Sequence, residues 1–180
     1  IIFGLGETLL VSANIGLSPW FVFQQGMSLK TSYSLGLTTF IVGIIVLLIW
    51  VPLNQKPGIG TILNIIIISL VIDLSLPYLP QPTTLFLKLI QVMIGVLLVG
   101  IGSGFYLIAN LGPGPRDGLT TGLQKKTNLS FSIVRTLIEL SVLVSGWYLG
   151  GLVGIGTIMY ALLVGPFVSV SFFYIAKFIK

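Results

Sequence analysis

The sequence predicts an all-α, polytopic membrane protein whose six transmembrane helices form two inverted three-helix repeats. Three observations lead to this prediction. Of the 180 residues, 55% are hydrophobic and only 7% are charged, and the mean hydropathy is +1.10, far above that of a soluble domain. The apolar residues gather in runs long enough to cross a bilayer. The second half of the chain repeats the first.

The apolar runs define six candidate transmembrane helices. A backbone in hydrocarbon must pair its hydrogen-bonding groups internally, so we expect each run to form a helix. The proline-rich segments 52–57 and 77–82 are expected to be tight turns. The first run is short, and we expect about ten further residues upstream in a helix that crosses a core of about 30 Å. The expected helices are residues 1–13, 33–51, 58–76, 83–109, 131–149 and 154–178.

The internal repeat becomes visible when the chain is shifted by 96 residues without a gap, which aligns Pro19 with Pro115. Ala13-Asn14-Ile15-Gly16 then matches Ala109-Asn110-Leu111-Gly112, and Gly58-Ile59-Gly60-Thr61-Ile62 is identical to Gly154-Ile155-Gly156-Thr157-Ile158. Each unit holds three spans, an odd number, so the second unit must enter the membrane from the opposite side. We expect residues 1–84 to form the first repeat and residues 85–180 the second, inverted one.

The connections after the first and fourth spans are too apolar and too glycine-rich for ordinary solvated loops. In each, an Asn-x-Gly break is followed by Pro19 or Pro115, and proline favours the start of a helix because its missing N–H is not needed there. Residues 19–29 and 115–126 are therefore expected to be short broken or re-entrant helices, whose N-termini attract anionic groups. The alternative is that these residues only shape interfacial loops.

The two breaks differ in the residues after the proline, which are Trp20-Phe21 in the first and Arg116-Asp117 in the second. A guanidinium binds carboxylate or phosphate well, so Arg116 is a candidate for contacting an anionic solute. The alternative is an interfacial arginine paired with the adjacent acid. The candidate substrate-binding residues are the polar ones of both breaks: Asn14, Gln24, Gln25, Asn110, Arg116, Asp117, Thr120 and Thr121.

Four ionisable residues, Glu7, Asp73, Arg135 and Glu139, lie within the expected spans, where their cost in hydrocarbon directs them toward the bundle interior. Arg135 and Glu139 are four residues apart on one helix and are expected to form an ion pair. Asp73 lies near a span end and is expected to reach the interface. Glu7 aligns with Ser103 in the second repeat, and the sequence offers it no basic residue as an ion-pair partner. The paired glycines within the spans indicate close helix packing rather than a nucleotide loop.

Cysteine and histidine are absent from the chain. Their absence excludes disulfides, thiolate nucleophiles and imidazole metal sites. The remaining residues offer no nucleophile with a base and no metal cluster. We therefore expect a protein that is not an enzyme, has no catalytic residues, and needs neither a metal nor a cofactor.

The net charge of +5 comes from scattered basic residues without an aromatic-interleaved patch, which argues against nucleic-acid binding. The distribution serves instead as a topology signal. The side with more basic residues, which carries both termini, is expected to be cytoplasmic. That side collects Lys56, Arg116, Lys125, Lys126, Lys177 and Lys180, and the other side only Lys30 and Lys88.

Several motifs resemble the YczE-like (YczE/YyaS/YitT) family of bacterial integral membrane proteins over nearly the whole chain. The resemblance implies a multi-pass protein of the bacterial cytoplasmic (inner) membrane, and it implies no substrate. Phe21 stands where relatives are expected to have an aspartate. The motifs are Ala13-Asn14-Ile15-Gly16-Leu17-Ser18-Pro19-Trp20, Gln25-Gly26, Pro57-Gly58-Ile59-Gly60-Thr61, Gly112-Pro113-Gly114-Pro115-Arg116-Asp117-Gly118, Arg135-Thr136 and Glu139-Leu140.

Two functions are compatible with these features. The first is a small transporter or permease that binds an anionic solute between its inverted repeats. The second is a non-transporting accessory or assembly subunit of a larger membrane complex. Besides the lipid bilayer, a homo-oligomer or such a complex is the expected partner. A polar cavity between the repeats would favour the transporter, and a dry interface would favour the subunit.

Overall fold

The structure of the protein is a computed structural model that describes residues 1–179, all of whose regular elements are helical. The expected spans agree with the observed helices to within two residues at each end. The short segments after α3 and α4 are 3-10 helices, η1 (Val51–Leu53) and η2 (Leu76–Tyr78). The α-helices are α1 (Ile2–Ala13), α2 (Pro19–Thr31), α3 (Leu35–Trp50), α4 (Ile59–Ser75), α5 (Leu85–Ala109), α6 (Pro115–Thr127), α7 (Phe131–Tyr148) and α8 (Ile155–Ile179).

Five helices in the described part of the chain are long and apolar enough to cross a membrane. They are α3 continued by η1, α4 continued by η2, α5, α7 and α8. The helix α1 is also apolar but has only 12 residues. The protein is therefore a multi-pass helical membrane protein in which α1, α2 and α6 are shorter than a span.

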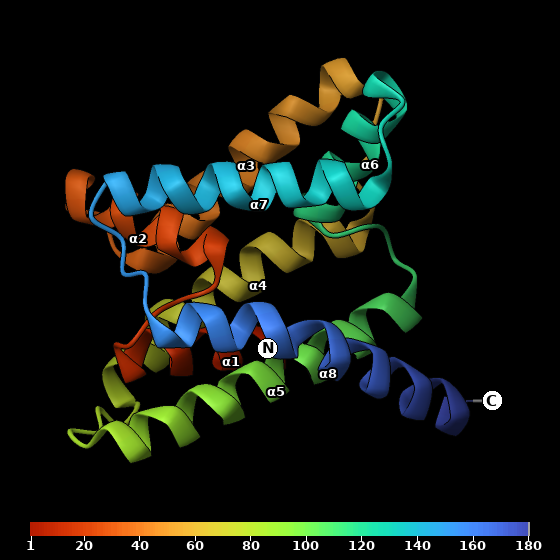
Figure 1. Ribbon diagram of the computed structural model, residues 1–180. Helices are drawn as coiled ribbons and strands as arrows, with labels where there is room; N and C mark the ends of the chain where they lie inside the picture. Colours follow the sequence, from red (N-terminus) through yellow and green to blue (C-terminus); the bar gives the residue numbers. More distant parts are fainter. Residues whose placement is uncertain (180) are drawn as a thin grey trace.

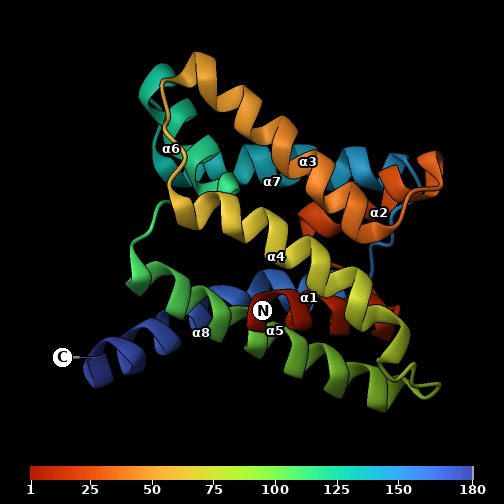
Figure 2. The same cartoon turned by 180° about the vertical axis from the view of Figure 1, so that it is seen from behind.

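The helices form two groups, with α4 between them (Figures 1 and 2). One group contains α2, α3, α6 and α7, and the other contains α1, α5 and α8. The helix α4 joins the groups because it packs against α3 on one side and α1 on the other. Since α1 packs along α5 and α2 packs along α7, each group combines helices from both halves of the chain.

The local structure recurs at the spacing of 96 residues that the sequence predicts. The helices α2, α3 and α4 begin at Pro19, Leu35 and Ile59, and α6, α7 and α8 begin 96 residues later in each case. The two breaks, residues 14–18 and 110–114, have left-handed backbone conformations at equivalent positions. Asn14 and Asn110 have φ of 54° and 47°, and Gly16 and Gly112 have φ of 125° and 121°. Asparagine and glycine tolerate this region, so the two Asn-x-Gly motifs end their helices in the same way.

Each break is held by a helix start from the other half of the chain. The amide of Gly60, at the start of α4, donates to the Leu111 carbonyl at 2.9 Å, and the amide of Gly156, at the start of α8, donates to the Ile15 carbonyl at 2.8 Å. These bonds satisfy carbonyls that the breaks leave free. The glycines at the starts of α4 and α8 make the close contacts that the sequence predicts, because the backbone of the opposite break comes too close to them for a side chain.

Glycines bring α1 and α5 into close contact, as the sequence predicts. A Cβ atom on Gly6 would lie 2.6 Å from the Gly95 carbonyl oxygen and 2.8 Å from the Val99 amide. A Cβ on Gly102 would lie 2.6 Å from the Phe3 amide. Small residues allow such approach between membrane helices, where dispersion contacts replace the hydrophobic effect as the source of stability.

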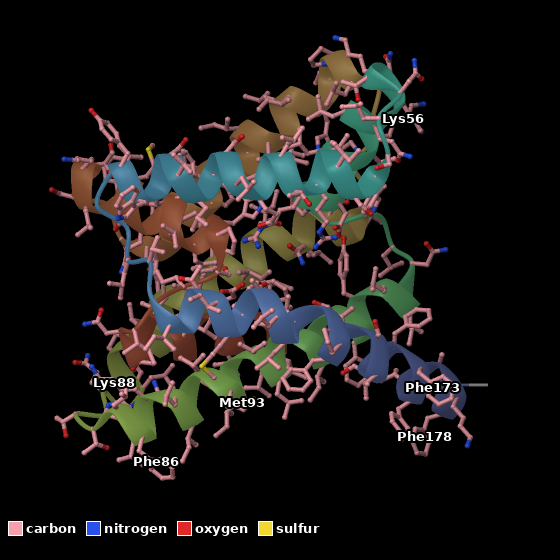
Figure 3. All side chains as sticks on the ribbon, in the orientation of Figure 1. Lys56, Phe86, Lys88, Met93, Phe173 and Phe178 are labelled. Atoms are coloured by element: carbon pink, nitrogen blue, oxygen red, sulfur yellow. The ribbon has the colours of Figure 1, made fainter. Side chains whose placement is uncertain are left out.

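The outer surface of the bundle is apolar, as lipid contact requires. Phe86 on α5 is 72% exposed and Phe178 on α8 is 87% exposed, and both point away from the bundle (Figure 3). Lys56 and Lys88 lie at opposite ends of the bundle (Figure 3). This arrangement places an apolar belt between two polar ends, which is typical of a bilayer-spanning protein.

We expect Gly6→Ala to lower the free energy of unfolding by about 1–3 kcal/mol, because the added methyl group must separate α1 from α5. The measurement is reversible unfolding in mixed detergent micelles. Gly165→Ala on α8 is the matched control, since its Cβ would meet no atom within 4 Å. Equal unfolding midpoints for the two variants would contradict the close contact.

Candidate functional site

A cavity of about 1200 Å³ lies between the two groups of helices and is lined by both halves of the chain. The cavity lies where the two halves of the chain differ in helix packing. The helix α3 packs along α4, but the corresponding helices α7 and α8 form no comparable contact in the described structure, and both line the cavity. The polar lining residues are Gln24, Thr39, Asn64, Ser103, Tyr106, Arg116, Asp117, Thr121, Arg135, Thr136, Glu139, Thr157 and Tyr160.

Arg116 reaches the cavity from the first turn of α6, which begins at Pro115. Its guanidinium carbon lies 5.2 Å from the ring centre of Trp20 and 5.9 Å from that of Phe21, so it contacts aromatic faces from the other half of the chain. The Trp50 indole donates to the Pro115 carbonyl at 3.0 Å and fixes the start of α6. Within residues 1–179 the guanidinium has neither a hydrogen-bond acceptor nor an ion-pair partner.

Arg135 pairs with Asp117 at 3.5 Å, and this contact corrects two expectations. The expected pair between Arg135 and Glu139 on α7 is wrong, and so is the alternative pair between Arg116 and Asp117. The physical reason is that α6 packs against α7, which brings Asp117 to Arg135, while Arg116 points toward the aromatic rings. Glu139 lines the cavity, half-buried, and has no hydrogen-bond or ion-pair partner in the described chain.

Glu7 is fully buried and lies next to Tyr160, a residue of the cavity lining. The Ser18 hydroxyl lies 2.9 and 3.1 Å from the two carboxylate oxygens, and the Tyr160 hydroxyl lies 3.4 Å from one of them. Ser18 precedes α2, and Tyr160 lies on α8, so the contact joins both halves of the chain. Hydrogen bonds to a buried carboxyl group offset part of the cost of removing it from water.

Trp20 adds a second unpaired donor to the site. The residue lines the cavity and is 4% exposed. Its indole nitrogen is buried and has no hydrogen-bond partner among residues 1–179. An indole N–H can only donate, so this buried donor is left unsatisfied within the described chain.

The structure brings half of the predicted substrate-binding residues to the cavity: Gln24, Arg116, Asp117 and Thr121 line it. The other four have structural contacts. Asn14 and Asn110 end α1 and α5 in the left-handed region. The side-chain Oε1 of Gln25 accepts from the Leu152 amide at 2.7 Å, and the Thr120 hydroxyl donates to the Arg116 carbonyl at 2.9 Å.

Asp73 also has a structural contact that the sequence did not predict. Its carboxylate accepts from the Ser34 hydroxyl at 2.6 Å and from the Gly36 amide at 2.7 Å. Both donors lie at the start of α3, where a negative charge is favourable because the helix leaves free amides there. The residue is exposed at a helix end, as expected for a group at the interface.

Sequence reasoning missed Asn64 and Tyr160 as cavity residues. The two occupy equivalent positions of the repeat, 96 residues apart, on α4 and α8. A polar side chain at the same position of two apolar helices is the signal that would have identified them. No group of three or more carboxylates suited to a metal ion occurs within residues 1–179.

Comparison with known proteins shows which sequences the chain is similar to. Residues 1–172 match a family of unknown function, DUF6198. The chain is 41% identical over 168 residues to an uncharacterized protein of Haemophilus influenzae, covering 93% of this chain and 77% of that relative. It is 34% identical over 167 residues to the uncharacterized membrane protein YczE of Bacillus subtilis, covering 92% and 78%. It is 28% identical over 174 residues to YyaS of the same organism, covering 94% and 87%. No solved structure matches the chain.

We expect Ser18→Ala to lower the free energy of unfolding by about 1–3 kcal/mol, because the fully buried Glu7 would lose its shortest hydrogen bonds. Ser141→Ala is the control. This exposed serine donates only to the Leu137 carbonyl of its own helix, and its loss should change stability by less than about 0.5 kcal/mol. Unfolding of both variants in mixed micelles tests the expectation, and an equal loss of stability would contradict it.

Proposed function

The chain belongs to the DUF6198 family and is a YczE-like, multi-pass membrane protein, and we propose that it is a small permease for an organic anion. The observation that carries the proposal is the guanidinium of Arg116. It lines a cavity formed by both halves of the chain and has no acceptor within residues 1–179. A charged group in a membrane protein is costly unless it is compensated, and a bound anion would compensate it.

The proposed architecture is a pair of inverted repeats, residues 1–84 and 85–180, with six spans. Three features support it: the recurrence of helix starts at 96 residues, the matching left-handed breaks, and the reciprocal hydrogen bonds at Gly60 and Gly156. In transporters built from inverted repeats, the halves move against each other around a central site. A cavity lined by both halves is compatible with that motion.

The helices α2 and α6 serve as broken or re-entrant elements in this proposal. The first residues of both, Pro19 and Pro115, line the cavity. Helix N-termini carry a partial positive charge and free amides, which favour an anionic group. Arg116, in the first turn of α6, adds a guanidinium without an acceptor to the same region. These features favour the permease over an accessory subunit, for which a sealed interface was expected.

The proposed location is the bacterial cytoplasmic membrane, with both termini in the cytoplasm. The positive-inside tendency supports this orientation, because Lys56, Lys125, Lys126 and Lys177 belong to the side expected in the cytoplasm and Lys30 and Lys88 to the other. Lys180, which was also assigned to the cytoplasmic side, lies outside the described residues.

Arg116→Gln should reduce uptake of the transported anion at least about tenfold, because the neutral amide removes the charge that binds it. Arg116→Lys should be intermediate, since it keeps the charge and loses the planar fork. Lys56→Gln, at one end of the bundle and outside the cavity lining, should match the wild type. The measurement is uptake of radiolabelled monocarboxylates, dicarboxylates and phosphate esters into proteoliposomes. Absence of uptake for every anion would overturn a permease for simple organic anions, and absence of uptake for zwitterionic carboxylates as well would favour the accessory subunit.

The orientation can be tested because the chain contains no cysteine. In intact cells, a membrane-impermeant maleimide should label Lys88→Cys and leave Lys56→Cys unlabelled until the cells are opened. Both residues lie at bundle ends, so both should react once they are accessible. The opposite labelling pattern would reverse the proposed topology.

A further inference from the structure

The charged residues that line the cavity divide into a pair and two single groups. Asp117 and Arg135 form an ion pair at 3.5 Å. Arg116 and Glu139 both line the cavity, and neither has a hydrogen-bond or ion-pair partner within residues 1–179. The cavity therefore presents one uncompensated positive group and one uncompensated negative group.

These two groups belong to the same region of the cavity. Arg116 precedes Asp117 on α6, Asp117 pairs with Arg135 on α7, and Glu139 follows Arg135 by one helical turn. The two side chains come from different helices, α6 and α7, so neither position follows from the other by helical spacing. Both groups therefore lie beside the contact between α6 and α7, and both line the same cavity.

A simple anion satisfies only half of this arrangement. It would compensate Arg116 but would leave Glu139 desolvated without a partner, and it would be repelled by that carboxylate. The charges of the two arginines and two acids in the lining sum to zero, and the buried carboxyl group of Glu7 contacts the lining residue Tyr160, so the region has no excess of positive charge to offer a simple anion. A ligand that carries one negative and one positive group would give Arg116 and Glu139 a partner each.

The apolar part of the lining indicates which kind of substituent the ligand carries. Aliphatic side chains from four helices surround the charged groups, which suits an apolar substituent. They include Val42 and Val46 on α3, Leu63 on α4, Leu140 and Leu143 on α7, and Val164 on α8.

We infer that the ligand of this cavity is a zwitterion with an apolar side chain, of the α-amino acid class. Its carboxylate binds Arg116, and its ammonium group binds Glu139. The inference rests on the proposed permease and on its contact between an anionic group and Arg116, and it replaces the simple organic anion with a solute that carries a carboxylate and an ammonium group.

The test compares three forms of each ligand. Alanine, valine, leucine and phenylalanine are each measured beside the carboxylic acid that lacks the amino group and the amine that lacks the carboxylate. Binding is measured by the rise in melting temperature of the purified protein with ligand concentration, and transport by uptake into proteoliposomes. At least one amino acid should bind about tenfold or more tightly than its acid and its amine, since each lost charge contact costs a factor of that order.

Substitutions of Glu139 and Arg116 test the ammonium contact and the carboxylate contact separately. Glu139→Gln should reduce the affinity for the amino acid to that of the matching acid and leave the affinity for the acid unchanged or higher. Glu139→Asp, which keeps the charge, should retain a preference for the amino acid and shows that the effect is not a loss of folding. Arg116→Gln should weaken binding of the amino acid and of the acid alike.

The outcomes distinguish the inference from the proposed function. If the acids bind and are transported as well as the amino acids, and Glu139→Gln changes neither, the zwitterion is overturned and the anion permease stands. If neither class binds or is transported, both fail. A preference for amino acids that Glu139→Gln abolishes supports both.

Discussion

The structure depends on one constraint, which is that the backbone groups left free where α1 and α5 end must find hydrogen-bond partners inside a membrane protein. The chain meets the constraint reciprocally. The break after α1 receives the amide of Gly156 from the start of α8, and the break after α5 receives the amide of Gly60 from the start of α4. Because each half supplies what the other lacks, neither break is stable alone, and the two halves must fold together.

The two halves share a backbone plan but exchange large and small side chains across their contacts. Trp50 on α3 packs on Gly118 of α6, whereas at the equivalent positions Gly146 of α7 packs against Val22 of α2. In each contact a glycine faces a larger residue, so both helix pairs pack closely. The same divergence makes the cavity asymmetric, because Arg116 aligns with Trp20, and the aligned positions meet in one cation–aromatic contact. A repeated scaffold thus supports a site that has no symmetry of its own.

The sequence could predict part of the site because helix starts and breaks are local features. Proline after an Asn-x-Gly motif identifies where α2 and α6 begin, and it therefore identifies Arg116 as a residue of the first turn. Spacing along one helix was misleading for Arg135, because α6 brings Asp117 closer to it than Glu139 is. Gln25 and Thr120 looked like site residues, but their polar atoms satisfy backbone groups. Polarity in a sequence does not say whether a group's partner is a ligand or the chain itself.

The sequence by itself determined the helical membrane class, the bounds of the helices and the 96-residue recurrence, because each depends on local hydropathy and on residues that begin or end a helix. Only the tertiary structure decided which charges are paired. It separated α7 from α8, opened the cavity there, and left Arg116 and Glu139 without partners in the described chain. The physical reason is that ion pairing depends on distances between helices, and those distances are set by the packing of apolar faces whose composition hardly varies along the chain.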